Sequence, residues 1–227
     1  MSAPLAIFDI DGTLVDSRAL ISQTMARAFE GQGLNPPDYE ATRKIVGLSL
    51  MEAVDRLAPR NFSHEKLLLL VEAYKAEFVA SRHSGQDHEP LYDGSLDLLE
   101  TLKSKGWKMG VATGKSRRGL DAIIKKYNFE HYFDVHFCAD DGAGKPDPFM
   151  VEANLSALKI PATQAVMIGD TSFDMLMGRA AHVHCLGVSW GFHTREEIEQ
   201  GGAHHIVETM SGLNEKLTEF GQTIMAA

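Results

Sequence analysis

Four short stretches of the chain combine residue types that could carry out chemistry together. They are Asp9-Ile10-Asp11-Gly12-Thr13, Thr113-Gly114, Gly144-Lys145-Pro146-Asp147-Pro148 and Gly169-Asp170-Thr171-Ser172-Phe173-Asp174. Clustered carboxylates repel one another and favour a divalent cation, and an all-oxygen ligand set suits Mg²⁺. A lysine adds a fixed positive charge and a threonine adds a hydroxyl donor. Such a set could receive a phosphoryl group, with one aspartate as a covalent nucleophile.

Each stretch taken alone also has a purely structural explanation. The first could be a turn, Thr113-Gly114 a helix entry, Lys145-Pro146 a solvated loop and Asp170 the cap of a helix. The combination is more informative because each stretch follows a run of apolar residues that predicts a strand. In open α/β sheets ligands bind outside the carboxyl ends of the strands, so all four stretches could meet in one crevice.

The elements that must position these residues are short strands alternating with helices. Strands are predicted at Leu5–Phe8, Trp107–Ala112, Val135–Cys138, Ala165–Ile168, Val183–Val188 and His205–Val207. Near-continuous apolar strands alternating with helices predict an α/β fold with a Rossmann-like, doubly wound parallel sheet. Asp147-Pro148 resembles an N-cap followed by proline at the first helical position, and Thr194 with Glu197 fits a capping box.

One long segment interrupts this alternation directly after the first strand. Apolar residues have helical spacing between Leu20 and Phe78, and no strand is predicted between Asp16 and Pro90. Ser84-Gly85-Gln86-Asp87 is expected to be the exit hinge of this insertion. We therefore predict a catalytic core made of residues 1–15 and 87–227, with a helical cap at residues 16–86.

Composition narrows the classes of partner. The 227 residues carry a net charge of −9, which argues against a nucleic-acid-binding or anionic-membrane surface. No apolar run approaches the ~20 residues of a membrane span, and no signal peptide is evident. The two cysteines, Cys138 and Cys185, lie in apolar runs and suggest no disulfide, so a cytoplasmic protein is expected. A monomer or a homodimer is expected as well.

At these motifs the sequence resembles the haloacid dehalogenase-like superfamily, and more narrowly its phosphoglycolate phosphatase-like members with a helical cap. The resemblance is carried by DIDGT (9–13), ATG (112–114), GKPDP (144–148) and GDTSFD (169–174). It implies a Mg²⁺-dependent phosphatase that hydrolyses a small phosphorylated metabolite, such as a phosphoglycolate-like phosphomonoester, through an aspartyl-phosphate.

The same resemblance implies roles for individual residues. Asp9 would be the nucleophile and a Mg²⁺ ligand, and Asp11 would transfer protons while its carbonyl binds the metal. Thr113 and the backbone of Gly114 would hold phosphoryl oxygens, and Lys145 would neutralise charge. Asp170 would be the second carboxylate ligand, with Asp174 either a ligand through water or the partner of Lys145. Further phosphate- or substrate-binding residues are expected at Gly12, Thr13, Lys115, Arg43 and Gly47, the last two in the cap.

Alternatives to a phosphatase remain open from sequence. Sugar-phosphate mutases of the β-phosphoglucomutase type share much of the pattern, and a pyrophosphatase would use the same groups. A non-enzymatic receiver-type module also combines a doubly wound sheet with Asp, Thr and Lys. The order of the motifs and the helical insertion argue against a receiver module. Dehalogenases of the superfamily that this sequence resembles lack a carboxylate two residues after the nucleophile. The resemblance therefore implies phosphoryl transfer, because Asp11 supplies that carboxylate.

Overall fold

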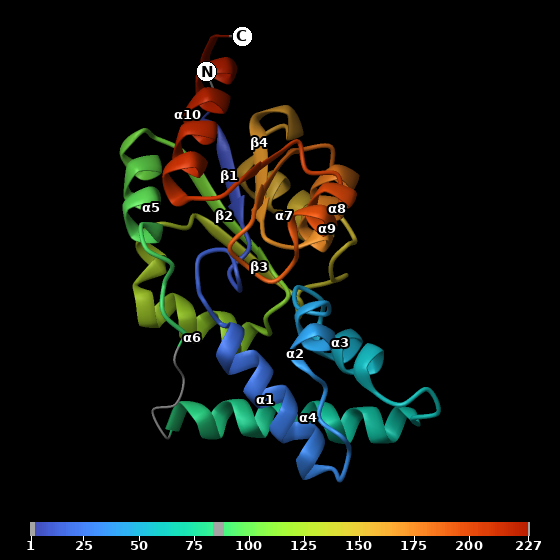
Figure 1. Cartoon of the computed structure of the whole chain (residues 1–227). Coiled ribbons are helices and arrows are strands. Elements are labelled where there is room, and N and C mark those ends of the chain that lie inside the picture. Colours follow the sequence, from blue (N-terminus) through green and yellow to red (C-terminus); the bar gives the residue numbers. More distant parts are fainter. Residues whose placement is uncertain (1–2, 84–88, 227) are drawn as a thin grey trace.

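Six short apolar runs form the strands of one sheet. They are β1 Leu5–Phe8, β2 Lys108–Thr113, β3 Val135–Cys138, β4 Ala165–Gly169, β5 His184–Val188 and β6 His205–Val207. The computed structural model describes residues 3–83 and 89–226 and shows helices on both faces of this sheet (Figure 1). The strand order is β3-β2-β1-β4-β5-β6, and all neighbouring strands are parallel. The predicted doubly wound α/β fold is confirmed.

The central strand β1 shows why the sheet is covered on both sides. All four of its residues are fully buried. Ala6 and Phe8 belong to one hydrophobic cluster, whereas Leu5 and Ile7 belong to another. Successive side chains of a strand point to opposite faces, so both faces of β1 pack against helices. All six strands occur where they are predicted, with ends shifted by at most one residue.

Helices of the core divide between the two faces. Leucines of α5 (Ser95–Ser104), α6 (Arg117–Tyr127) and α10 (Met210–Ala226) join the cluster that contains Phe8. Methionines of α7 (Phe149–Leu158) and α8 (Ser172–Ala180) join the cluster that contains Ile7. The short helix α9 (Arg195–Gln200) packs beside α8 and β6. Two 3₁₀ turns, Phe129–His131 and Ala162–Gln164, complete the core elements among the described residues.

Local signals at the helix starts are mostly confirmed. Thr194 and Glu197 form the predicted capping box at α9. The prediction at Asp147-Pro148 is wrong by one position, because Pro148 is the cap residue and α7 begins at Phe149. The Asp147 carboxylate still accepts a hydrogen bond from the backbone N–H of Phe149, at 2.9 Å. Asp147 therefore stabilises the helix start from one residue further away than predicted.

The segment after β1 forms a helical unit beside the sheet (Figure 1). It contains α1 Arg18–Gly31, α2 Tyr39–Arg43, α3 Leu50–Leu57 and α4 His64–His83. Residues of α1, α3 and α4 share a hydrophobic cluster separate from those of the sheet, which makes this unit a cap with its own core. The predicted exit hinge at Ser84–Asp87 lies outside the described residues, so the boundary at residues 86–87 stays a prediction.

Among the helices in the described ranges, none combines the length and the apolar character needed to cross a bilayer.

Candidate active site

The predicted chemical residues gather at one edge of the sheet. Asp9 follows β1, Thr113 ends β2 and Asp170 follows β4. Because β2 and β4 flank β1 on opposite sides, the strand order reverses at β1, which is where open α/β sheets bind ligands. Lys145 reaches the same place from the loop between β3 and α7. The structure thus brings together residues from all four stretches.

Lys145 lies between two carboxylates. Its Nζ is 2.9 Å from Asp9 Oδ1 and 2.6 Å from Asp174 Oδ1, and none of the three side chains is more than 1% exposed. Burial lowers the pKa of a lysine, but the attraction of Asp174 and Asp9 outweighs burial, and the pKa of Lys145 is raised. Lys145 therefore carries a fixed positive charge directly beside Asp9.

Three buried carboxylates form a cluster that fits a divalent cation. Asp9, Asp170 and Asp174 each place an oxygen within 4.8 Å of the others. Burial, with repulsion from Asp174 and Asp11, raises the pKa of Asp9 to about 7 despite Lys145, and burial with the same kind of repulsion raises that of Asp170. Asp9 Oδ2 is buried and has no hydrogen-bond partner within the described part of the chain. When all three carboxylates are ionised, the single charge of Lys145 leaves the cluster negative, and an oxygen-binding cation such as Mg²⁺ would complete its neutralisation.

Hydrogen bonds from Thr13 and from the backbone of Phe192 hold the Asp170 carboxylate in place. The Thr13 hydroxyl donates to Asp170 Oδ1 at 2.8 Å, and the Phe192 N–H donates to Oδ2 at 2.8 Å. A Cβ at Gly12, where φ is +81°, would lie only 2.2 Å from Asp170 Oδ2. Gly12 and Thr13 are predicted to bind phosphate or substrate, but the structure places them against Asp170. Their contacts favour a role in orienting that carboxylate.

Asp174 has both oxygens engaged. Oδ2 accepts hydrogen bonds from the N–H and the hydroxyl of Thr171, at 3.0 and 2.6 Å, in a capping box that begins α8. Oδ1 faces Lys145. Of the two predicted roles, the geometry therefore favours the partner of Lys145, while a contact with a metal through water stays a prediction.

Asp11 is paired with a second lysine whose side chain is largely buried. Lys115 Nζ lies 2.8 Å from Asp11 Oδ1 and 3.2 Å from Glu89 Oε1. The Lys115 side chain is 7% exposed, and its backbone N–H donates to the Thr113 hydroxyl at 3.4 Å. Lys115 is predicted to bind phosphate, but the structure brings its ammonium group to the proposed proton-transfer residue. Its contacts favour positioning of Asp11.

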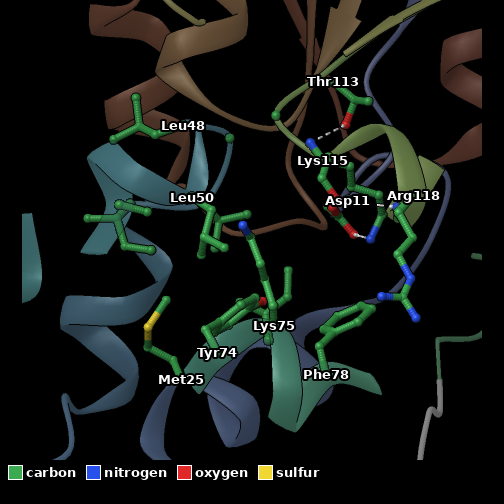
Figure 2. Close-up of a pocket in the computed structure, with 18 of the residues that line it drawn as sticks. Asp11, Met25, Leu48, Leu50, Tyr74, Lys75, Phe78, Thr113, Lys115 and Arg118 are labelled. Atoms are coloured by element: carbon green, nitrogen blue, oxygen red, sulfur yellow. Dashed lines mark hydrogen bonds and ion pairs between the residues drawn. The ribbon is translucent and has the colours of Figure 1, made fainter. Parts of the chain in front are cut away.

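A cavity of about 340 Å³ opens between the cap and this edge of the sheet (Figure 2). Asp9, Asp11, Thr113 and Gly114 line it on the core side, and Gly47 lines it on the cap side. A Cβ on Gly114 would lie 2.4 Å from the carbonyl oxygen of Gly47, so cap and core touch at this point. Glycine at 114 permits this close approach, and Gly47 adopts a φ of +100° that favours glycine. The cap segment around Gly47 therefore lies over the site.

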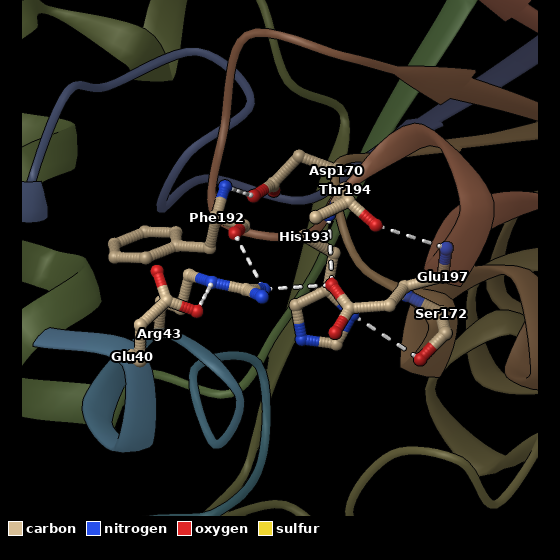
Figure 3. Close-up of polar contacts among 8 residues, drawn as sticks. All are labelled: Glu40, Arg43, Asp170, Ser172, Phe192, His193, Thr194 and Glu197. Carbon is tan, nitrogen blue, oxygen red and sulfur yellow. Dashed lines mark hydrogen bonds and ion pairs between the residues drawn. The ribbon is translucent and has the colours of Figure 1, made fainter.

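Arg43 lies in a polar contact between cap and core (Figure 3). Its guanidinium pairs with Glu40 at 2.8 Å and with Glu197 at 2.7 Å, and it donates to the carbonyl of Phe192 at 3.3 Å. Arg43 does not line the cavity. Two carboxylates already neutralise its charge, so this arrangement favours a role in holding the cap to the core over the predicted contact with substrate.

Sequence reasoning missed three residues that shape the site. Glu89 is buried beside Lys115, but a single glutamate before Pro90 carries no recognisable motif. Tyr74 and Phe78 line the cavity from α4. Their helical spacing predicts an apolar face, yet the pattern does not distinguish a face that packs in a core from one that lines a cavity.

The fold combines a doubly wound sheet with an inserted helical cap. Asp9, Thr113, Lys145 and Asp170 meet at the edge of the sheet where the strand order reverses. This combination defines a hydrolase of the phosphoryl-transfer type. The chain belongs to the haloacid dehalogenase-like hydrolase family, whose model matches residues 6–188. The narrower resemblance to phosphoglycolate phosphatase-like members is also confirmed by the relatives.

Two relatives and one solved structure illustrate the similarity. The "probable phosphatase IndB" of Dickeya dadantii is 32% identical, over 92% of this chain and 90% of the relative. A phosphoglycolate phosphatase of Pseudomonas fluorescens is 28% identical, over 92% of this chain and 78% of the relative. The crystal structure of a "predicted phosphatase" from Clostridium acetobutylicum has a TM-score of 0.85 at 27% identity, and it covers 96% of this chain and 100% of that one.

Proposed function

We propose that the protein is a Mg²⁺-dependent phosphatase that hydrolyses a small phosphomonoester through an aspartyl-phosphate on Asp9. The placement of Asp9 carries this proposal. It lies beside the positive charge of Lys145, within a carboxylate cluster suited to a cation, and it lines the cavity between cap and core. Because Asp11 stands two residues away and lines the same cavity, a proton-transfer group is available beside the nucleophile.

The first step would transfer the phosphoryl group to the protein. A carboxylate oxygen of Asp9 attacks phosphorus, and the bond between phosphorus and the ester oxygen breaks. Asp11 donates a proton to the departing oxygen, so the alcohol leaves uncharged. Lys145 offsets negative charge near Asp9, and the hydroxyl of Thr113 donates to a phosphoryl oxygen.

The second step would release phosphate. A water molecule attacks phosphorus of the aspartyl-phosphate while the Asp11 carboxylate takes its proton. The bond to the Asp9 oxygen breaks, which restores the free carboxylate and liberates inorganic phosphate. Asp9 and Asp170 would hold Mg²⁺ together with the backbone carbonyl of Asp11. When bound, Mg²⁺ supplies neutralisation of charge on the phosphoryl oxygens.

Phosphate release tests the proposal directly. With Mg²⁺ the protein should release phosphate from p-nitrophenyl phosphate, and a chelator should abolish the activity. Asp9→Asn keeps the shape but loses the nucleophile, so activity should fall at least about a thousandfold while circular dichroism stays unchanged. Asp121→Asn, at a carboxylate 59% exposed on α6, is the matched control and should retain activity. Near-normal Mg²⁺-dependent release by Asp9→Asn would contradict the mechanism.

Two further measurements separate the alternatives. A sugar-phosphate mutase would convert glucose 1-phosphate into glucose 6-phosphate, whereas the proposed phosphatase would release inorganic phosphate. A receiver-type module would keep a long-lived phosphorylated Asp9 with negligible turnover. Rapid multiple turnover with free phosphate as product is the expected result.

A further inference from the structure

The cap side of the cavity is built mainly from uncharged, apolar side chains. Figure 2 shows the polar core residues at one end and these cap residues opposite them. The principal members are Met25, Ile45, Leu48, Leu50, Tyr74 and Phe78. Since such walls offer water few hydrogen bonds, the part of a ligand that lies against them is favoured when it is apolar.

Two aromatic rings of α4 give this wall a flat surface. The rings of Tyr74 and Phe78 lie one helical turn apart, with centroids separated by 6.0 Å and planes inclined by 28°. The Tyr74 hydroxyl lies near the charged groups of Lys115, Asp11 and Glu89. Burial raises the pKa of this hydroxyl, so it remains a donor. The wall therefore offers a ring surface and a hydroxyl that can donate a hydrogen bond.

Cations that line the cavity are poorly placed to hold a second anionic group. Asp11 and Glu89 already neutralise Lys115. Lys75 is 53% exposed and pairs with Glu72 at 2.7 Å, and Arg118 is exposed. Ion pairs at such exposed positions contribute little. A carboxylate or second phosphate against the apolar wall would lose its hydration without a buried counter-charge.

We infer that the substrate is a phosphomonoester whose alcohol carries an uncharged aromatic or heteroaromatic ring, held against the cap wall beside Tyr74 and Phe78 of α4. This inference rests on the proposed phosphatase function and deepens it. It differs from the phosphoglycolate-like substrate that the resemblance implies, because the two-carbon glycolate group would fill little of a cavity of about 340 Å³ and would bring a charge to its apolar side. Gly47 and Gly114 approach each other closely where cap and core meet, so the cap wall stands over the space that the ring would occupy.

Matched primary alkyl phosphates provide the test, since their leaving oxygens are alike and only the attached group changes. Phosphate release is measured for 2-phenylethyl phosphate, uridine 5′-monophosphate, phosphoglycolate and glucose 6-phosphate. At least one ring-bearing ester should exceed both hydrophilic esters in kcat/KM by about tenfold or more. A preference for phosphoglycolate or glucose 6-phosphate would overturn the inference while leaving the phosphatase function intact. No release from any ester would instead overturn the proposed function.

Two variants of α4 test whether the ring of Phe78 contacts the substrate. Phe78→Leu keeps an apolar side chain but removes the flat ring, whose centroid also lies 5.6 Å from Lys115 Nζ. It should lower kcat/KM for the preferred ring-bearing ester several-fold more than for phosphoglycolate, mainly through KM. Leu69→Ala is the control, because Leu69 is 55% exposed on the same helix and does not line the cavity. An equal loss for both esters in Phe78→Leu would assign Phe78 a structural role and overturn the proposed ring contact.

Discussion

Replacing Asp9 by asparagine should stabilise the metal-free protein even as it removes activity. Asp9 is fully buried beside Asp174 and Asp11, and its pKa rises from the ordinary 3.8 to about 7. At about 1.4 kcal/mol per pH unit, this rise corresponds to roughly 4 kcal/mol between the two protonation states. That value is an upper limit, because Asp9→Asn also loses the contact with Lys145, which keeps Asp174 as a partner.

The sign of the pH dependence follows from proton binding. Between about pH 4 and pH 7 the folded protein holds a proton on Asp9 that the unfolded chain has released. Stability of the metal-free wild type should therefore fall as pH rises through this window. The asparagine side chain of Asp9→Asn cannot titrate, so the variant should gain about 1–3 kcal/mol over wild type at pH 8 and little near pH 4.

Urea unfolding in the presence of a chelator, followed by tryptophan fluorescence at pH 4.5 and pH 8, measures both values. Addition of Mg²⁺ at pH 8 should stabilise wild type more than the variant, because the added cation relieves the same repulsion. Asp121→Asn, with an exposed carboxylate, should show no such pattern. A variant less stable than wild type at pH 8, or a difference independent of pH, would refute the electrostatic reasoning.

Three further substitutions test individual contacts. Lys115→Met should slow hydrolysis of 2-phenylethyl phosphate at least about tenfold more than that of 2,4-dinitrophenyl phosphate, whose leaving group needs no proton from Asp11; equal slowing would contradict the positioning role. Thr13→Val removes the hydrogen bond to Asp170, so it should lower the free energy of unfolding by about 1–3 kcal/mol and raise the Mg²⁺ concentration for half-maximal activity. An unchanged Mg²⁺ titration would contradict the proposal that Thr13 orients Asp170. Arg43→Gln should reduce stability in urea but leave KM for the preferred ester within about twofold; a tenfold rise in KM would restore the predicted substrate contact.

The sequence predicted the sheet well because each strand is a short apolar run between clear turn residues. The sequence is enough to predict one shared site, because parallel strands end at one edge of the sheet and that edge binds ligands. The residues of this site are Asp9, Thr113, Lys145 and Asp170. The order of the strands places Asp9, Thr113 and Asp170 at one edge, and the loop after β3 carries Lys145 to them.

The sequence does not reveal the contact partners of residues in and near the motifs. Thr13, Lys115 and Arg43 have side chains suited to phosphate, but each instead contacts a carboxylate that is distant in sequence. Such partners depend on how loops and cap pack together, which neither periodicity nor spacing reveals. The same limit applies to Tyr74, whose place at the cavity depends on the position of α4 over the core.

Phe192 links the cap to the core, although it lies outside the inserted residues 16–86. Its ring completes the hydrophobic cluster of the cap, and its N–H holds Asp170. The cap core is thus encoded partly in a segment far downstream of the inserted residues. A chimera that exchanges only residues 16–86 for the cap of a relative would separate this ring from its own packing partners. Successful transplantation of substrate preference should require the loop around residue 192 to be exchanged with the cap.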